Sequence, residues 1–200
     1  MSNTKHSRSA KGTASGSTRS QIEAAAIRLF AEKGVTETSI RDIGAAVDIT
    51  EGALYRHFHS KDQLVRLLFE RHYIAFAERL EALAATEHTA REKVAAMIRG
   101  FCAAHDEDPR LFRFLLFVQH GQLGKLAPGA PTPVDAVRAV VDAGIAAGEI
   151  PRQDPDLATA LVFGVVLQPV QFSAYGRIAP EMTPLSGHLE AAAWAALTAV

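Results

Sequence analysis

Residues 38–58 read TSIRDIGAAVDITEGALYRHF, and this stretch decides the predicted fold. Its first part has an apolar face made of Ile40, Ile43, Ala46 and Val47. Residues 48–49 form a tight connection, after which Thr50 is placed to cap a second helix with Leu54 and Phe58 facing inward. Two short helices joined by so few residues must cross steeply, which predicts a helix-turn-helix.

Charge is distributed unevenly along the chain. Over the 200 residues, 21 Lys and Arg stand against 22 Asp and Glu, and this near-neutral total by itself argues against nucleic acid, because phosphate binding usually needs surplus positive charge. Residues 1–71, however, hold eleven basic and eight acidic residues, whereas residues 72–200 hold ten and fourteen, so the balances are +3 and −4. This asymmetry hints that the part containing the helix-turn-helix meets a polyanion.

Helix start and stop signals on both sides of this stretch predict further helices. Residues 22–30 carry apolar side chains at helical spacing, behind a capping box of Thr18 and Gln21 and ahead of Gly34, a residue suited to a left-handed C′ position. Six more starts are marked by capping boxes or by N-cap residues before proline: Ser60 with Gln63, Thr89 with Glu92, Asp108-Pro109, Thr132-Pro133, Asp154-Pro155 and Thr183-Pro184. With short helices at about 38–47 and 50–58, we expect roughly nine helices and an all-α fold.

Three regions follow from composition and motifs. Residues 1–17 lack large apolar side chains after Met1, which predicts a disordered basic arm that is either an inert tail or a DNA contact. We expect residues 18–62 to form the helix-turn-helix domain and residues 63–200 to form a helical domain, to which the resemblance described below assigns ligand binding and dimerisation.

Several function classes find no support in the sequence. A single cysteine, Cys102, forms no intramolecular bridge, and it is either a small core residue or a thiol sensor. The most apolar runs, 161–167 and 191–197, are far shorter than the ~20 residues of a membrane span, so we expect a cytoplasmic protein without membrane contact. With no catalytic or metal-binding spacing present, we expect no enzyme, no cofactor and no metal; His57 and His59 do not share a helix face.

Aromatic residues with a few polar neighbours recur in the second half of the chain. They either pack the core or line a cavity for a small apolar or aromatic ligand, and the candidates are Phe101, His105, Phe114, Phe117, His120, Gln168, Phe172 and Tyr175. Pro169 interrupts the helix that begins at Asp154 and is expected to kink it.

Residues 22–30, the stretch 38–58 and the following HSKDQL resemble the DNA-binding domain of the TetR family of one-component transcriptional regulators. The match spans about residues 19–69 and depends on the order of Ile43, Ala45, Gly52, Leu54, Tyr55, Phe58 and Lys61. Beyond Phe69 the resemblance reduces to helix number and length.

The resemblance assigns roles to nine residues. Arg41 would read a guanine, and the base-facing start of the recognition helix would be Thr50, Glu51, Gly52 and Ala53. Tyr55, His57 and Lys61 would contact phosphates, and Thr38 would cap the second helix, at about 38–47, and donate to phosphate. Glu51 stands where the family often has Lys and Arg56 where it often has an aromatic residue, which implies an unusual operator.

The family also implies a mechanism. The last two helices would pair with their copies in a homodimer through apolar stripes made of Leu161, Val162, Val165, Val166, Leu189, Ala193, Trp194 and Leu197. The dimer would bind a palindromic double-stranded DNA operator, most commonly as a repressor, and a small-molecule effector would release it by shifting the helix that begins near Lys61. The alternatives are an activator of the same family, a small-ligand binding protein without a DNA role and an all-α enzyme.

Overall fold

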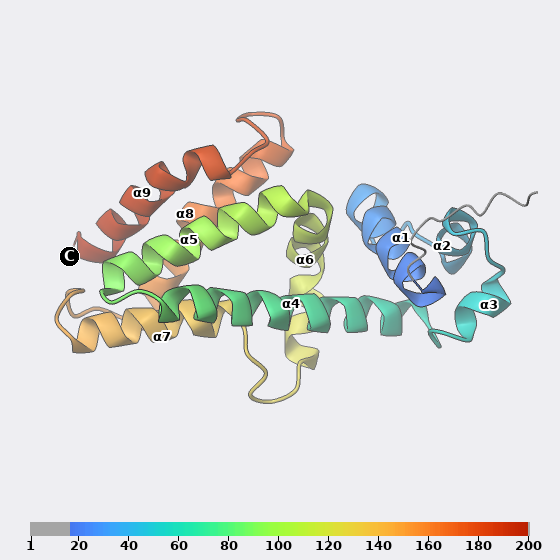
Figure 1. Ribbon diagram of the computed structural model, residues 1–200, viewed down its shortest axis with the longest axis horizontal. Helices are drawn as coiled ribbons and strands as arrows, with labels where there is room; N and C mark the ends of the chain where they lie inside the picture. The colour runs from blue at the N-terminus through green and yellow to red at the C-terminus, as the bar shows by residue number, and fades with distance from the viewer. Residues whose placement is uncertain (1–16, 200) are drawn as a thin grey trace, which may run out of the picture.

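The computed structural model describes residues 17–199, and over these residues the chain is helical without a strand (Figure 1). In chain order the elements are α1 (Thr18–Lys33), α2 (Ile40–Ala46), α3 (Glu51–Tyr55), α4 (Lys61–Ala85), α5 (Ala90–Glu107), α6 (Pro109–Gln122), the 3₁₀ helix η1 (Leu123–Lys125), α7 (Pro133–Ala146), α8 (Pro155–Ala174), the 3₁₀ helix η2 (Thr183–Leu185) and α9 (Ser186–Thr198). The prediction of an all-α fold with about nine helices is confirmed. The predicted basic arm lies outside the described residues except for Ser17.

Most of the predicted helix starts are correct. The side chains of Thr50, Ser60, Thr89, Asp108, Thr132 and Asp154 accept backbone amide hydrogen bonds at the starts of α3 to α8. The prediction for α1 is wrong by one residue, because Ser17 rather than Thr18 accepts from the Ser20 amide.

The predicted start at Thr183 is also wrong. Thr183 and Pro184 open the short helix η2, and α9 begins at Ser186 without a side-chain cap. The physical reason is tertiary: the carboxylate of Asp106, on α5, accepts from the amides of Met182 and Thr183 at 2.8 Å each and ties this turn to α5.

Two hydrophobic cores lie one behind the other along α4. The first contains α1, α2, α3 and the buried residues of α4 from Leu64 to Tyr73, and the second contains α4 from Leu80 onward with α5, α7, α8 and α9. In Figure 1, α4 runs from the end beside α3 to the opposite end beside α7. One continuous helix therefore joins both parts of the chain.

Helix α6 provides a second connection between the cores. Phe114 is buried in the first core, where its ring stacks on Phe30 of α1 with 5.8 Å between centroids. Phe112, two residues earlier, belongs to the second core and packs edge-on against Phe101 at 5.0 Å. A shift of α6 would therefore change the packing of both cores.

The predicted dimer stripes on α8 and α9 are largely buried within the subunit. Five of the eight stripe residues are buried in the subunit's own core: Val162, Val166, Leu189, Ala193 and Leu197. The exposed large apolar side chains of α8 are Leu161, which the predicted stripe included, and Leu157 and Phe172, which it did not. The prediction misassigned the five buried positions because apolar residues at helical spacing occur both in a subunit's own core and in a subunit interface.

The helix α8 also continues through Pro169 to Ala174 and is longer than the apolar run recognised in the sequence. Within residues 17–199 it is the one helix whose length and composition match a membrane span, with 28% of its most apolar window buried in the subunit. By themselves these two properties are weak evidence for a membrane segment, since core helices share them.

Candidate nucleic-acid interface and ligand cavities

Helix α3, the predicted recognition helix, is short and is anchored by the residues on its inner face. Leu54 and Phe58 are buried against the first core, with at most 1% of each residue exposed. At its start, the Thr50 hydroxyl accepts from the Ala53 amide at 3.2 Å. This anchoring presents the start of α3 and the turn after it to solvent, so that Glu51, Gly52, Tyr55, Arg56 and His57 are exposed.

The turn between α2 and α3 depends on Gly44, which sequence reasoning missed, and on Asp48, which was predicted in the connection but not with a left-handed backbone. A Cβ atom on Gly44 would lie 2.9 Å from the Ile49 carbonyl oxygen, so only glycine fits there without a shift of the backbone. The Gly44 carbonyl in turn accepts from the Ile49 amide at 3.0 Å. Asp48 has a φ of 56°, which places it in the left-handed region that aspartate tolerates better than most residues. The sequence signal that could have revealed this turn geometry is a glycine four residues before an aspartate at the predicted turn.

Thr38 does not cap α2 as predicted. Ser39 caps α2 in a reciprocal capping box with Asp42. The Thr38 side chain is fully buried, and its hydroxyl lies 2.8 Å from the Gly34 carbonyl oxygen and 3.3 Å from that of Leu29. Thr38 therefore fastens the α1–α2 connection to the end of α1, and its hydroxyl is engaged within the subunit.

Lys61 is engaged in a similar way. Its ammonium donates to the carbonyl oxygens of Val35, Thr36 and Thr38 at 2.8, 3.4 and 3.0 Å. The first residue of α4 thus holds the α1–α2 connection. In this arrangement all three ammonium protons have protein acceptors, so the side chain supports the interface from within.

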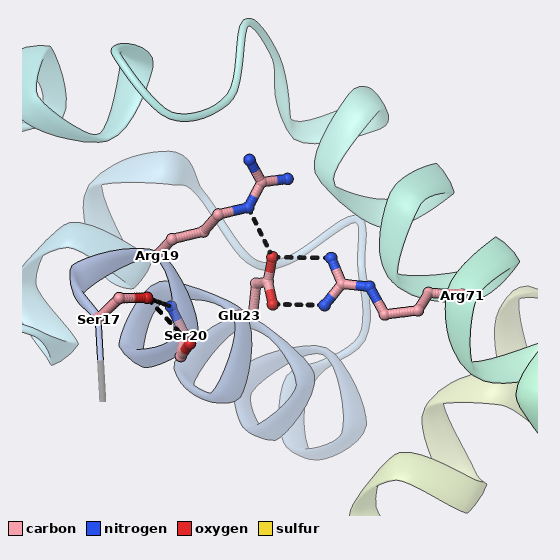
Figure 2. A network of polar contacts seen from close by, with 5 residues as sticks. All are labelled: Ser17, Arg19, Ser20, Glu23 and Arg71. Carbon is pink, nitrogen blue, oxygen red and sulfur yellow. Dashed lines mark hydrogen bonds and ion pairs between the residues drawn. The ribbon is translucent and has the colours of Figure 1, made fainter. Parts of the chain in front are cut away.

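Glu23 joins α1 to α4 (Figure 2). Its carboxylate accepts a bidentate pair from Arg71 at 2.7 and 3.0 Å and a third hydrogen bond from Arg19 Nε at 3.1 Å. The hydrogen bond from Arg71 is the largest influence on the pKa of Glu23 and holds it below its usual value. The Arg19 guanidinium also lies 5.0 Å from the centre of the Phe58 ring, so this cluster reaches the end of the recognition motif.

A first ligand-sized cavity lies in the second core. It has a volume of about 380 Å³ and an almost wholly apolar wall that includes Tyr73, Phe76, Phe101, Phe112 and Phe163. Tyr73 and Phe76 come from α4, and Phe112 comes from α6. The two helices that reach the first core therefore also form the wall of this cavity.

A second cavity of about 510 Å³ adjoins the first and shares Leu116, Gln119 and Leu167 with it. Its wall is more polar and includes His105, Arg113, Phe117, His120, Gln171 and Tyr175. Of the predicted ligand residues, Phe101 lines the first cavity, and His105, Phe117, His120 and Tyr175 line the second.

Three predicted ligand residues line neither cavity. Phe114 is buried against α1, and Gln168 and Phe172 lie on the exposed face of α8. Helical periodicity does not reveal this difference, because it depends on which neighbour each face of α6 and α8 meets.

Cys102 is buried in the second core. It is 1% exposed, and burial raises the pKa of its thiol to about 11. The thiolate is therefore scarce at neutral pH, which favours the core role over a thiol sensor.

Residues 22–68 match the family model described as "Bacterial regulatory proteins, tetR family". This segment of the chain is therefore similar to the DNA-binding part of TetR-family regulators. It is 43% identical over 53 residues to the HTH-type transcriptional regulator TtgR of Pseudomonas putida, covering 26% of this chain and 25% of that protein. It is 56% identical over 41 residues to the HTH-type transcriptional repressor Rv3405c of Mycobacterium tuberculosis, covering 20% and 22%. The chain thus matches about a quarter of the length of these curated relatives, in the DNA-binding segment.

Solved TetR-family structures extend the likeness to the whole fold. A tetR-family regulatory protein from Rhodococcus RHA1 superposes with a TM-score of 0.75 at 19% identity, covering 92% of this chain and 98% of that one. The transcriptional regulator FadR from Bacillus subtilis, solved in complex with stearoyl-CoA, superposes with a TM-score of 0.71 at 20% identity, covering 90% and 98%. At these identities the likeness establishes the TetR-family architecture.

Proposed function

We propose that this protein is a ligand-responsive transcriptional repressor of the TetR family, which binds a palindromic operator as a homodimer and is released by a small molecule bound in its C-terminal part. The observation that carries the proposal is that α4 and α6 both line the apolar cavity and pack in the core beneath the recognition helix. The Mycobacterium tuberculosis relative is named as a repressor, and the Bacillus subtilis neighbour holds an acyl thioester.

On the DNA side, the exposed start of α3 would enter the major groove. Arg41, exposed on α2, would read a guanine through O6 and N7, and Glu51 would accept from a cytosine amino group. Tyr55 and His57 would donate to phosphates and fix the register. Thr50, Gly52 and Ala53 would allow the backbone to approach the bases, while Lys61 and Thr38 would support α2 from behind.

A homodimer would bring two such helices onto one operator. The apolar side chains that α8 leaves exposed include Leu157 and Leu161, and α9 exposes the small residues Ala191 and Ala195 beside it. A second copy would cover this surface through the same two helices and account for the apolar character of α8 in a DNA-binding protein of the cytoplasm.

Release would follow from a shift of α4 and α6. A ligand that favours one arrangement of Phe76 and Phe112 around the cavity would move these helices relative to α1 and change the separation of the two recognition helices. The ligand weakens operator binding only to the extent that it prefers the arrangement with the wrong separation.

Footprinting on the promoter beside the protein's own gene tests the proposal. We expect a palindromic footprint that weakens with salt and is lost on adding the effector. A Tyr55→Phe variant should bind the operator about two- to tenfold more weakly with unchanged stability, because Tyr55 is 46% exposed and loses one hydrogen bond. Tyr175→Phe removes a phenol hydroxyl remote from α3, in the wall of the second cavity, and is the matched control for operator binding measured without effector. A footprint strengthened by the effector would indicate an activator, and no footprint at low salt would favour a ligand-binding protein without a DNA role.

A further inference from the structure

The side chains of one arginine and two histidines line the second cavity. Arg113, His105 and His120 all line it, and among residues 17–199 no carboxylate lines it. The Arg113 guanidinium lies 5.6 Å from the centre of the Phe117 ring and has no carboxylate partner within the described chain. A cation left without a counter-charge beside an apolar ring is well placed to receive an anion.

His105 provides a buried polar group at the same place. The residue is 8% exposed, and its Nδ1 lies 2.9 Å from the Asp106 carboxylate. Asp106 is itself fixed by the backbone amides of Met182 and Thr183, so the imidazole ring is held in one orientation. The hydrogen bond to Asp106 leaves Nε2 as the ring's other polar atom, and no described residue bonds to it.

The ring of His105 also stands between the two cavities. It packs edge-on against Phe112, which lines the first cavity, with 5.4 Å between ring centroids. The charge of the one carboxylate lining that cavity, Asp156, is balanced by Arg138, whose Nε lies 2.6 Å from it. The first cavity therefore offers an uncharged apolar space, and the second offers positive charge directly beside it.

We propose that the effector is an amphiphilic carboxylic acid, with its apolar body in the first cavity and its carboxylate held by Arg113 in the second, beside His105 and His120. This inference rests on the proposed function, in which the C-terminal part binds a small molecule. It adds the chemical class of that molecule. Arg113 suits a carboxylate because its planar guanidinium donates two parallel hydrogen bonds.

Direct binding without DNA tests this inference separately from operator release. Decanoate and 3-phenylpropanoate would be titrated by calorimetry against the full chain, next to their methyl esters and decyltrimethylammonium. We expect the acids to bind at least tenfold more tightly than their esters and more tightly than the cation. We expect Arg113→Gln to remove that preference while leaving ester affinity unchanged, and Arg113→Lys to retain part of it.

Arg152→Gln is the matched control, since it removes the same charge from an exposed residue outside both cavities. Circular dichroism would establish that each variant folds. Esters binding as tightly as acids, a preference for the cation, or full acid preference in folded Arg113→Gln would each overturn the inference. If no acid bound while the operator footprint remained, this inference would fail and the proposed DNA-binding function would stand.

Discussion

Arg71 of α4 donates two parallel hydrogen bonds to Glu23 of α1, at 2.7 and 3.0 Å, across 48 residues of sequence. The pair fastens the first helix of the DNA-binding part to the helix that forms a wall of the apolar cavity. Because Arg19 shares the Glu23 carboxylate and also contacts the Phe58 ring, the attachment extends to the end of the recognition motif.

Replacing Glu23 by Gln should lower the free energy of unfolding by about 1 kcal/mol or less, because Arg71 is half exposed and exposed ion pairs contribute little. Its larger effect should be on coupling: the effector concentration needed to release the operator should change, since α1 is less tightly tied to α4. Thermal unfolding and operator titrations with effector would measure both. Glu32→Gln, which removes weaker contacts at 3.5 and 3.7 Å, is the control. Identical release curves for Glu23→Gln and the native chain would contradict the prediction.

Lys61→Met should destabilise the chain by about 1–3 kcal/mol, because three backbone carbonyls lose their donor. Urea unfolding would measure the loss, with the exposed Lys125→Met as control. The salt dependence of operator binding distinguishes the supporting role from a phosphate contact: a supporting lysine leaves the slope of log affinity against log salt unchanged, whereas a lost phosphate contact reduces it by about one.

Two glycine substitutions should have different effects on the free energy of unfolding. Gly44→Ala should cost about 1–3 kcal/mol, because the new Cβ would lie 2.9 Å from a backbone oxygen. Gly52→Ala meets nothing within 4 Å in a helix and should be neutral or stabilising by up to about 1 kcal/mol. Operator binding should weaken in both, in Gly52→Ala through crowding of the groove. Equal stability of the two variants would show that the α2–α3 turn adjusts easily.

Asp106→Asn should alter the pH dependence of stability. Burial by itself raises the pKa of Asp106, but hydrogen bonds from His105, Met182 and Thr183 outweigh it and lower the pKa to about 2. A carboxyl with a depressed pKa stabilises the fold above its unfolded value, near 3.8, and that contribution is lost as the pH falls toward about 2. The deficit of Asp106→Asn should therefore be full at pH 7 and shrink between pH 4 and pH 2.

Thermal unfolding from pH 2 to pH 7 would measure that deficit, with Glu181→Gln, an exposed residue of the same linker, as control. A deficit independent of pH would mean that the linker is held by contacts other than the Asp106 carboxylate.

The sequence by itself determined the helices and the DNA-binding motif, because the signals involved are local. A cap such as Thr89 bonds to an amide three residues away, and the apolar face of residues 22–30 repeats within two turns. The same locality explains the errors of one residue. Thr38 and Ser39 are both residue types that cap helices. Ser39 caps α2 because the Thr38 hydroxyl is bonded to backbone carbonyls at the end of α1.

Only the tertiary structure decided which side chains meet across the chain. Phe112 and Phe114 share a helix and a residue type, yet one lines a cavity and the other stacks on α1, because they face different neighbours. Glu23 meets Arg71, and Lys61 meets the α1–α2 connection, only after α4 has packed against α1. Helical period states which residues share a face, but what covers that face is set by packing between elements distant in sequence.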